Sequence, residues 1–324
     1  MSAVWRWVKR SLFGLVLVVV ALLVVGSGYE QWSRFRLPHS HPPPGQLIAV
    51  DGRKQHLSCL GEGAPTVILE AGFTVNGSLH WYKVQPAASR SARVCSYDRA
   101  GILWSDRGEE PRDGNRIAEE LHALLQTAGV PPPFVIVAHS VGGVFARIYD
   151  QRFPGEIAGF VFVDSSHPEQ QQRLPQTGNS GSGAPPGLSF FTGTGIVRSM
   201  MLPADPPAGT DADVHATTMA YWPISAHAMF AEIASVERTT QEEEVRRSLN
   251  PRPMVVLSRS IFSSDDERIA WMRMQDEIAA SSQNSIHRVV TDTRHNIQME
   301  RPDAVIEAIE QVVAAIRENK ALSE

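Results

Sequence analysis

The stretch "PFVIVAHSVGGVFARIYDQRFP", residues 133–154, changes from an apolar run to an amphipathic one within a few positions. The run Phe134–Ala138 is typical of a buried strand, and the residues from Gly142 onwards have helical periodicity. Ser140 lies at the junction, with small residues two positions away on either side. A strand that reverses into a helix crowds its neighbours, so this pattern indicates a sharp turn that holds the serine hydroxyl above the sheet. A serine that only capped a helix would not explain the small flanking residues.

The composition is that of an ordinary globular chain. Its 324 residues carry a formal net charge of −5, with 43% hydrophobic and 20% charged residues. This length suits one large α/β domain with an insertion. A nucleic-acid partner would need a basic face, and the scattered cysteines and histidines lack the spacing of a metal site. We therefore expect no nucleic-acid partner, no metal and no cofactor.

From residue 46 onwards, apolar runs alternate with segments of helical periodicity. Residues 46–63 predict a hairpin around the turn signal Asp51-Gly52. Continuous apolar strands separated by helices indicate a mostly parallel sheet that is buried on both faces. The remaining strands are predicted at 66–72, 92–101, 134–140, 157–164, 253–260 and 287–292.

Residues 165–250 interrupt this alternation between the predicted strands 6 and 7. They contain a loop rich in Gly, Ser and Pro at 174–189 and two predicted helices, around 211–220 and 225–248. We expect a helical cap beside the carboxyl ends of the strands, where parallel α/β sheets bind ligands. Large apolar side chains of this segment are candidates to line a substrate pocket. They are Phe190, Phe191, Met200, Met201, Met219, Tyr221, Trp222, Met229 and Phe230.

The N-terminal segment, residues 1–36, is much more apolar than the rest. Arg6, Lys9 and Arg10 precede an uninterrupted apolar run at 12–25. A helix from Ser11 to Tyr29 would span about 28 Å, close to the bilayer core of about 30 Å. Basic residues before the run favour an N-terminus inside and a domain exported to the periplasmic or extracellular side.

Two fates of this segment stay open. It is either an uncleaved membrane anchor or a signal that is cleaved near the small residues Gly26-Ser27-Gly28, which would make the protein secreted. Residues 37–45, which include "PHSHPPPG", predict a stiff spacer that cannot hold a helix. The folded domain is then expected over 46–320.

Five stretches carry a family resemblance: "EAGF" (70–73), "SYDRAG" (96–101), "AHSVGG" (138–143), "GFVFVDSSHPEQ" (159–170) and "RHNIQMERPDAV" (294–305). Together they resemble the α/β-hydrolase superfamily, in its branch of exported or membrane-anchored esterase-like proteins, over about residues 46–315. The resemblance implies the α/β-hydrolase fold. The chain departs from the usual pattern at Ala138 and Arg294, where glycine is common, and in "GILWSD", which lacks a second glycine. None of these changes removes a catalytic group.

The resemblance implies a catalytic triad with Ser140 as nucleophile. The base follows the last strand in this superfamily, which assigns that role to His295. Asp164 is the favoured acid, because an unpaired carboxylate at the end of an apolar strand would be costly. Asp265 or Asp266 is the alternative acid, nearer the commonest family position, although both also suit the start of a helix.

The resemblance also implies an oxyanion hole and its support. The backbone N–H groups of Val141 and Phe73 are the expected donors. Asp98 and Arg99 resemble an element that braces the loop behind the site. His139, next to the nucleophile, is expected to be structural.

Cys59 and Cys95 lie in the second and fourth predicted strands. These strands are neighbours in the α/β-hydrolase fold, so the resemblance implies that a disulfide can form in an exported protein. Two buried free thiols are the alternative.

The expected activity is hydrolysis of a carboxylic ester with an apolar acyl group, through an acyl-enzyme. An amidase, an aminopeptidase or a cofactor-free perhydrolase would use the same residues, and a non-catalytic binding protein of this fold is a further alternative. Epoxide hydrolases and haloalkane dehalogenases of this superfamily carry a carboxylate where Ser140 stands, which disfavours those reactions. The sequence does not predict the oligomeric state.

Overall fold

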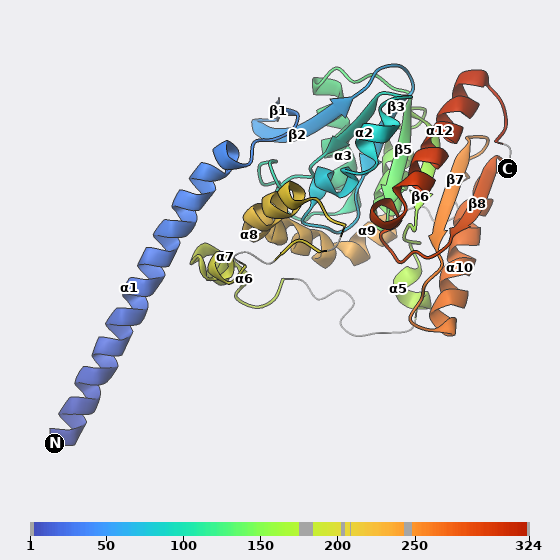
Figure 1. The fold of residues 1–324 in the computed structure, drawn as a ribbon. Helices are drawn as coiled ribbons and strands as arrows, with labels where there is room; N and C mark the ends of the chain where they lie inside the picture. Colours follow the sequence, from blue (N-terminus) through green and yellow to red (C-terminus); the bar gives the residue numbers. More distant parts are fainter. Residues whose placement is uncertain (1–2, 175–183, 202–204, 208, 243–247, 323–324) are drawn as a thin grey trace.

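The polypeptide forms an eight-stranded sheet with helices on both faces and a long N-terminal helix that extends away from it (Figure 1). The computed structural model describes residues 3–174, 184–201, 205–207, 209–242 and 248–322. The strands lie in the order β1-β2-β4-β3-β5-β6-β7-β8. They are β1 Gln46–Val50, β2 Arg53–Leu60, β3 Thr66–Glu70, β4 Val94–Tyr97, β5 Phe134–His139, β6 Ile157–Val163, β7 Met254–Arg259 and β8 Ser285–Val290.

The helices of the described residues fall into the N-terminal helix, the helices that flank the sheet, and those of the cap. The first is α1 Ala3–Ser40. The flanking group is η1 Gly77–Trp81, α2 Gln85–Ala88, α3 Gly114–Thr127, α4 Gly142–Arg152, α10 Asp265–Ala280, α11 Ile297–Glu300 and α12 Pro302–Glu318. The cap group is α5 Gln170–Arg173, α6 Leu188–Gly193, α7 Ile196–Met200, α8 Ala212–Ala234 and α9 Val236–Glu242.

The sheet is buried on both faces, as its apolar strands predict. Neighbouring residues of β5 such as Ile136 and Val137 belong to separate apolar clusters on opposite faces. Helices α3, α4 and α10 pack on the first face, and α2 and α12 pack on the second. The strands β3 to β8 pair with one another in parallel. The pairs β1–β2 and β2–β4 are antiparallel. The prediction of an α/β-hydrolase fold with a mostly parallel sheet is therefore confirmed.

The predicted hairpin is also confirmed, and its turn has the backbone that its sequence favours. Val50 pairs with Arg53, so only Asp51 and Gly52 connect β1 to β2. Both have positive φ, 49° at Asp51 and 79° at Gly52. Asp-Gly is favoured in such a two-residue turn because both residues tolerate this region.

The cap lies between β6 and β7, as expected, but its helices differ from the prediction. Helix α8 runs without a break from Ala212 to Ala234 through Pro223, where a break was predicted between helices around 211–220 and 225–248. The second predicted helix falls on the end of α8 and on α9. A proline costs a helix one backbone hydrogen bond. Here burial of Pro223 and Ser225 against the domain favours a continuous helix, and the Ser225 hydroxyl accepts a 2.9 Å bond from the Leu103 N–H. Most of the predicted loop at 174–189 lies outside the described residues, and α6 begins at its end.

The expected spacer at 37–45 was wrong in its first residues, because α1 continues through Pro38 to Ser40. Leu37 is buried in a small apolar cluster with Trp104 and Tyr221. The Trp104 indole donates a 2.8 Å hydrogen bond to the His41 carbonyl. These contacts hold the last turn of α1 against the domain, so the helix continues where the sequence alone suggested an extended linker.

Cys59 and Cys95 form a disulfide between β2 and β4. The two residues face each other in the antiparallel register, with Cα atoms 4.0 Å apart. The pairing that the neighbouring strands made possible is therefore present.

We expect alkylation of the unreduced protein to modify neither Cys59 nor Cys95, and alkylation after reduction to modify both. The double substitution Cys59→Ala with Cys95→Ala should lower the free energy of unfolding by about 2–4 kcal/mol, because the bridge limits the unfolded chain. Mass spectrometry and urea unfolding measure these effects. Two reactive thiols in the unreduced, exported protein would contradict the pairing.

Candidate active site

Ser140 lies in the tight turn between β5 and α4. Its φ is 54°, a region that non-glycine residues rarely adopt and that is common at functional sites. Small neighbours make this turn possible: a Cβ added to Gly72 would lie 2.8 Å from the Ser140 Cβ, and one added to Gly142 would lie 2.9 Å from the Ala71 oxygen. The sharp strand–serine–helix turn that was predicted from residues 133–154 is therefore present.

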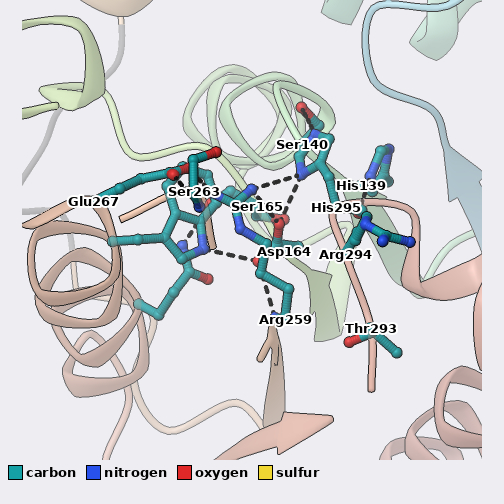
Figure 2. Close-up of polar contacts among 12 residues, drawn as sticks. His139, Ser140, Asp164, Ser165, Arg259, Ser263, Glu267, Thr293, Arg294 and His295 are labelled. Atoms are coloured by element: carbon teal, nitrogen blue, oxygen red, sulfur yellow. Dashed lines mark hydrogen bonds and ion pairs between the residues drawn. The ribbon is translucent and has the colours of Figure 1, made fainter. Parts of the chain in front are cut away.

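His295 lies after β8, just before α11, with its imidazole beside the serine (Figure 2). Its Nε2 is 3.0 Å from the Ser140 Oγ, and its Nδ1 is 2.6 Å from the Asp164 Oδ2. The His139 Nε2 is 2.9 Å from the His295 carbonyl oxygen. The structure thus brings together Ser140, His295 and Asp164 in one hydrogen-bonded chain, and His139 contacts the backbone of His295.

Asp164 follows β6 directly and its side chain is fully buried. Three further groups donate to its carboxylate: the Trp271 indole at 2.7 Å, the Arg259 backbone N–H at 3.1 Å and the Arg259 guanidinium at 3.1 Å. The same guanidinium donates to Glu267 at 2.6 Å (Figure 2). Four donors, counting His295, satisfy a charge that would otherwise be costly to bury.

Sequence reasoning missed Arg259 and Trp271. Arg259 is the last residue of β7, and that position at a strand's carboxyl end was a usable signal. Trp271 lies in α10, 107 residues after Asp164, and only the packing of α10 brings it to that carboxylate.

The alternative acids lie elsewhere. Asp265 and Asp266 occupy the first turn of α10, and both are exposed. Asp265 accepts from Arg268 at 3.1 Å. Ser264 is the N-cap residue of this helix, with its hydroxyl accepting from the Glu267 N–H. The prediction that these aspartates are acidic residues at a helix start is correct, although neither is the cap itself.

The two expected oxyanion donors lie on segments that flank Ser140. Val141 is the N-cap residue of α4, so its N–H belongs to the positive end of that helix. Phe73 follows Gly72, which packs directly against the serine. The Phe73 ring lies edge-on to Phe145 of α4, with 6.3 Å between ring centroids.

Arg99 is buried and braces the loop that carries Phe73. Its guanidinium donates to the carbonyl oxygens of Ala71 and Gly72, each at 2.7 Å. It also donates to Glu70 at 2.6 Å and to both oxygens of Glu232 at 2.9 and 2.8 Å. Burial raises the pKa of Glu70, although the charge of Arg99 opposes that shift.

Glu232 was not predicted as part of this network. It lies in α8 and its side chain is fully buried, and through Arg99 it connects the cap to the loop beside Ser140. Asp98, the other residue of the predicted brace, accepts a 2.6 Å bond from the Ser78 N–H and contacts His56 at 2.8 Å.

Two further histidines lie near His295, and burial disfavours their charged forms. Desolvation lowers the pKa of His80 to about 4 and holds the pKa of His139 well below its usual value. The His80 and His139 rings are 5.1 Å apart, and the His139 and His295 rings 4.6 Å. A lowered pKa makes the His80 and His139 imidazoles weaker proton acceptors than an ordinary histidine.

Among the described residues, one group has metal-ligand chemistry: His167, Glu169 and Glu277, whose ligand atoms lie within 4.8 Å of one another. Arg173 donates to Glu277 at 2.7 Å and to Glu169 at 3.3 Å. This guanidinium pairs with both carboxylates and would repel a cation, so the residues present fit an ion-pair cluster better than a metal site.

A protein-family model described as alpha/beta hydrolase fold matches residues 65–181. An AB hydrolase superfamily protein of Gibberella zeae is 32% identical over 41% of this chain and 42% of its own length. The chain spans about half or less of the length of such curated relatives.

Solved structures are similar over most of the chain. A putative ancestral haloalkane dehalogenase has a TM-score of 0.65 at 16% identity, covering 85% of this chain and 100% of its own. A thermophilic esterase from Thermogutta terrifontis has a TM-score of 0.57 at 16% identity, covering 84% of this chain and 98% of its own. At this level of identity the likeness shows the fold. The matched family model, the strand order and these neighbours agree that the chain has the α/β-hydrolase fold.

Proposed function

We propose that this protein is a serine hydrolase that cleaves a carboxylic ester through an acyl-enzyme intermediate. The observation that carries the proposal is the continuous hydrogen-bonded chain from Ser140 through His295 to Asp164. A serine hydroxyl is a weak nucleophile without an adjacent base, and a base needs a group that orients it. Both distances in this chain are within hydrogen-bond reach.

In the proposed reaction, Ser140 Oγ attacks the ester carbonyl while His295 Nε2 takes the hydroxyl proton. The tetrahedral oxyanion accepts hydrogen bonds from the Val141 and Phe73 N–H groups. His295 then protonates the leaving alcohol as the carbon–oxygen bond breaks, which gives the acyl-serine. Water, deprotonated by His295, attacks the acyl-serine. His295 then returns the proton to Ser140 Oγ as the acyl carbon–oxygen bond breaks, which releases the acid and restores the serine. Asp164 stabilises the imidazolium that forms in each half-reaction.

The residue at the nucleophile position separates this proposal from the chemistry of some structural neighbours. Haloalkane dehalogenases and epoxide hydrolases of the superfamily use a carboxylate there, whereas this chain has Ser140. The neighbouring Thermogutta terrifontis protein is an esterase by its description, which is consistent with the proposal.

We further propose that α1 is retained as a membrane anchor. It is long and apolar enough to cross a membrane, and none of its most apolar window is buried against the domain. Glu30 of α1 is fully buried and donor groups of Arg198 in α7 reach it at 2.7 Å. Gly26, at the possible cleavage site, lies inside the continuous helix and contacts the cap. A segment built into the cap in this way suits an anchor better than a signal that is removed.

The substitution Ser140→Ala should abolish both ester turnover and covalent labelling by a fluorophosphonate, since loss of a serine nucleophile costs orders of magnitude in rate. The matched control is Ser89→Ala, because that hydroxyl donates only within its own turn, to Pro86. Circular dichroism checks that both variants fold. Retained labelling in Ser140→Ala would contradict the nucleophile assignment.

Asp164→Asn should reduce kcat by about 10⁴-fold, by analogy with serine proteases, because the amide cannot stabilise the imidazolium. Asp265→Asn with Asp266→Asn should keep full activity and lose less than about 1 kcal/mol of stability, since Ser264 retains the helix cap. Steady-state kinetics with p-nitrophenyl esters measures both variants. An active Asp164→Asn beside an inactive double variant would move the acid to α10.

The full-length protein should remain in the membrane pellet after an alkaline carbonate wash, because about 28 Å of apolar helix holds it in the bilayer. N-terminal sequencing of the mature protein should begin upstream of Gly26. A soluble mature chain that starts just after this residue would instead establish a cleaved signal.

A further inference from the structure

The cap presents apolar side chains to the outside on its two short helices, α6 and α7. Phe190 and Phe191 of α6 are 53% and 46% exposed, and Ile196 and Met200 of α7 are 37% and 80% exposed. These four side chains define the α6–α7 face. Three of them were expected to line a substrate pocket, but they point outward instead. A cluster of large apolar side chains on an exposed surface marks an interaction site.

The turn between α6 and α7, at Thr194 and Gly195, packs directly on α1. A Cβ added to Gly26 would lie 2.3 Å from the Thr194 oxygen, and one added to Gly195 would lie 2.6 Å from the Gly26 oxygen. The turn between α6 and α7 therefore meets α1 backbone to backbone, which only glycine allows at both positions. Figure 1 shows that α6 and α7 are the part of the domain nearest the free, N-terminal half of α1.

Ion pairs one helical turn further along α1, at Glu30, stabilise this contact, which we call the seat: the packing of Gly26 and Glu30 of α1 against the cap. Glu30 accepts from Arg198 at 2.7 Å and from Arg34 at 2.7 Å. Arg34 also donates to the Thr192 carbonyl of α6 at 3.5 Å, and Arg198 donates to the Ala220 carbonyl of α8 at 2.7 Å. A buried carboxylate with two guanidinium partners prevents α1 from rotating or sliding on the cap without leaving charges unpaired.

The position of the seat along α1 determines how deep in a membrane the α6–α7 face would lie. No charged residue occurs between Arg10 and Glu30. These two residues are about 30 Å apart along the helix, which equals the thickness of the bilayer core. Gly26 lies one turn inside this boundary, on the exported side. Tyr29 and Trp32 follow on α1, and such aromatic residues are typical of the interface between lipid and water.

We propose that the α6–α7 face binds the outer surface of the phospholipid bilayer, with Phe190, Phe191 and Met200 inserted among the lipids at the boundary of the hydrocarbon core. The inference rests on the proposed anchoring by α1. It goes further, because α1 alone would tether the domain without orienting it. The seat at Gly26 and Glu30 turns the cap towards the membrane, so the exposed apolar face is covered by lipid and an apolar ester substrate meets the cap from the bilayer.

The test places a nitroxide label at Met200→Cys in the full chain, reconstituted in phosphatidylcholine vesicles. The native cysteines form a disulfide, so the label reacts with the introduced thiol. Collisions with oxygen, which concentrates in lipid, are compared with collisions with a water-soluble nickel chelate. Label at position 200 should favour oxygen. The matched control is Ile269→Cys on α10, an apolar side chain that is 43% exposed, and there the nickel chelate should dominate.

A third label, at Leu17→Cys, separates this inference from the anchoring on which it rests. Oxygen-dominated collisions at both 17 and 200 support the inference. Lipid exposure at 17 with water exposure at 200 overturns the inference alone, whereas water exposure at 17 overturns the anchoring and the inference with it.

The seat itself is tested by adding Gly26→Val to the position-200 and position-17 labels. The added side chain cannot fit against Thr194, so label 200 should shift towards the nickel chelate while label 17 stays in lipid. Unchanged lipid exposure at 200 would overturn the role of the seat. Fluorophosphonate labelling of Ser140 in every variant confirms that the domain is folded.

Discussion

The burial of one carboxylate, Asp164, constrains the whole site. An ionised carboxylate without partners is very costly in a protein interior, so four donors must converge on it. They come from β7, from α10 and from the loop after β8. The order and register of the last strands and the docking of α10 are therefore tied to the position of His295 beside Ser140. A displacement of any of these elements would both expose the charge and break the hydrogen-bonded chain.

A second buried charge, Arg99, links the cap to the reaction centre. It holds two carbonyl oxygens of the loop that carries Phe73 and forms a bidentate pair with Glu232 of α8. Because a buried guanidinium needs all of its partners, a movement of α8 would be transmitted to the proposed oxyanion hole. The cap is therefore part of the site's support as well as its cover. Through α7 and Glu30 the same cap also contacts α1, so α1, the cap and the site form one connected unit.

Much of this molecule was predictable because its signals are local. The alternation of apolar strands and helices, the Asp51-Gly52 turn and the crowded turn around Ser140 each depend on residues close in sequence, and each is present. The cost of an unpaired carboxylate at the end of β6 also pointed to Asp164. By contrast, the breaks predicted between residues 220 and 225 and at residue 37 were wrong, since α8 and α1 continue through them. Sequence alone does not show the packing of Ser225 and Leu37 that stabilises these continuous helices.

The sequence by itself determined the fold class and pointed to Ser140 and His295 as the proposed nucleophile and base, because a strand–serine–helix turn and a histidine after the last strand follow from chain order. Only the tertiary structure decided that Asp164 is the carboxylate in contact with His295, and that Arg259 and Trp271 hold this carboxylate. It also decided that Glu232 of the cap holds Arg99 behind the loop that carries Phe73. It also decided that Phe190, Phe191 and Met200 point outward beside α1. These are contacts between residues about 100 or more positions apart, or choices between two faces of short helices, and local periodicity carries no information about either.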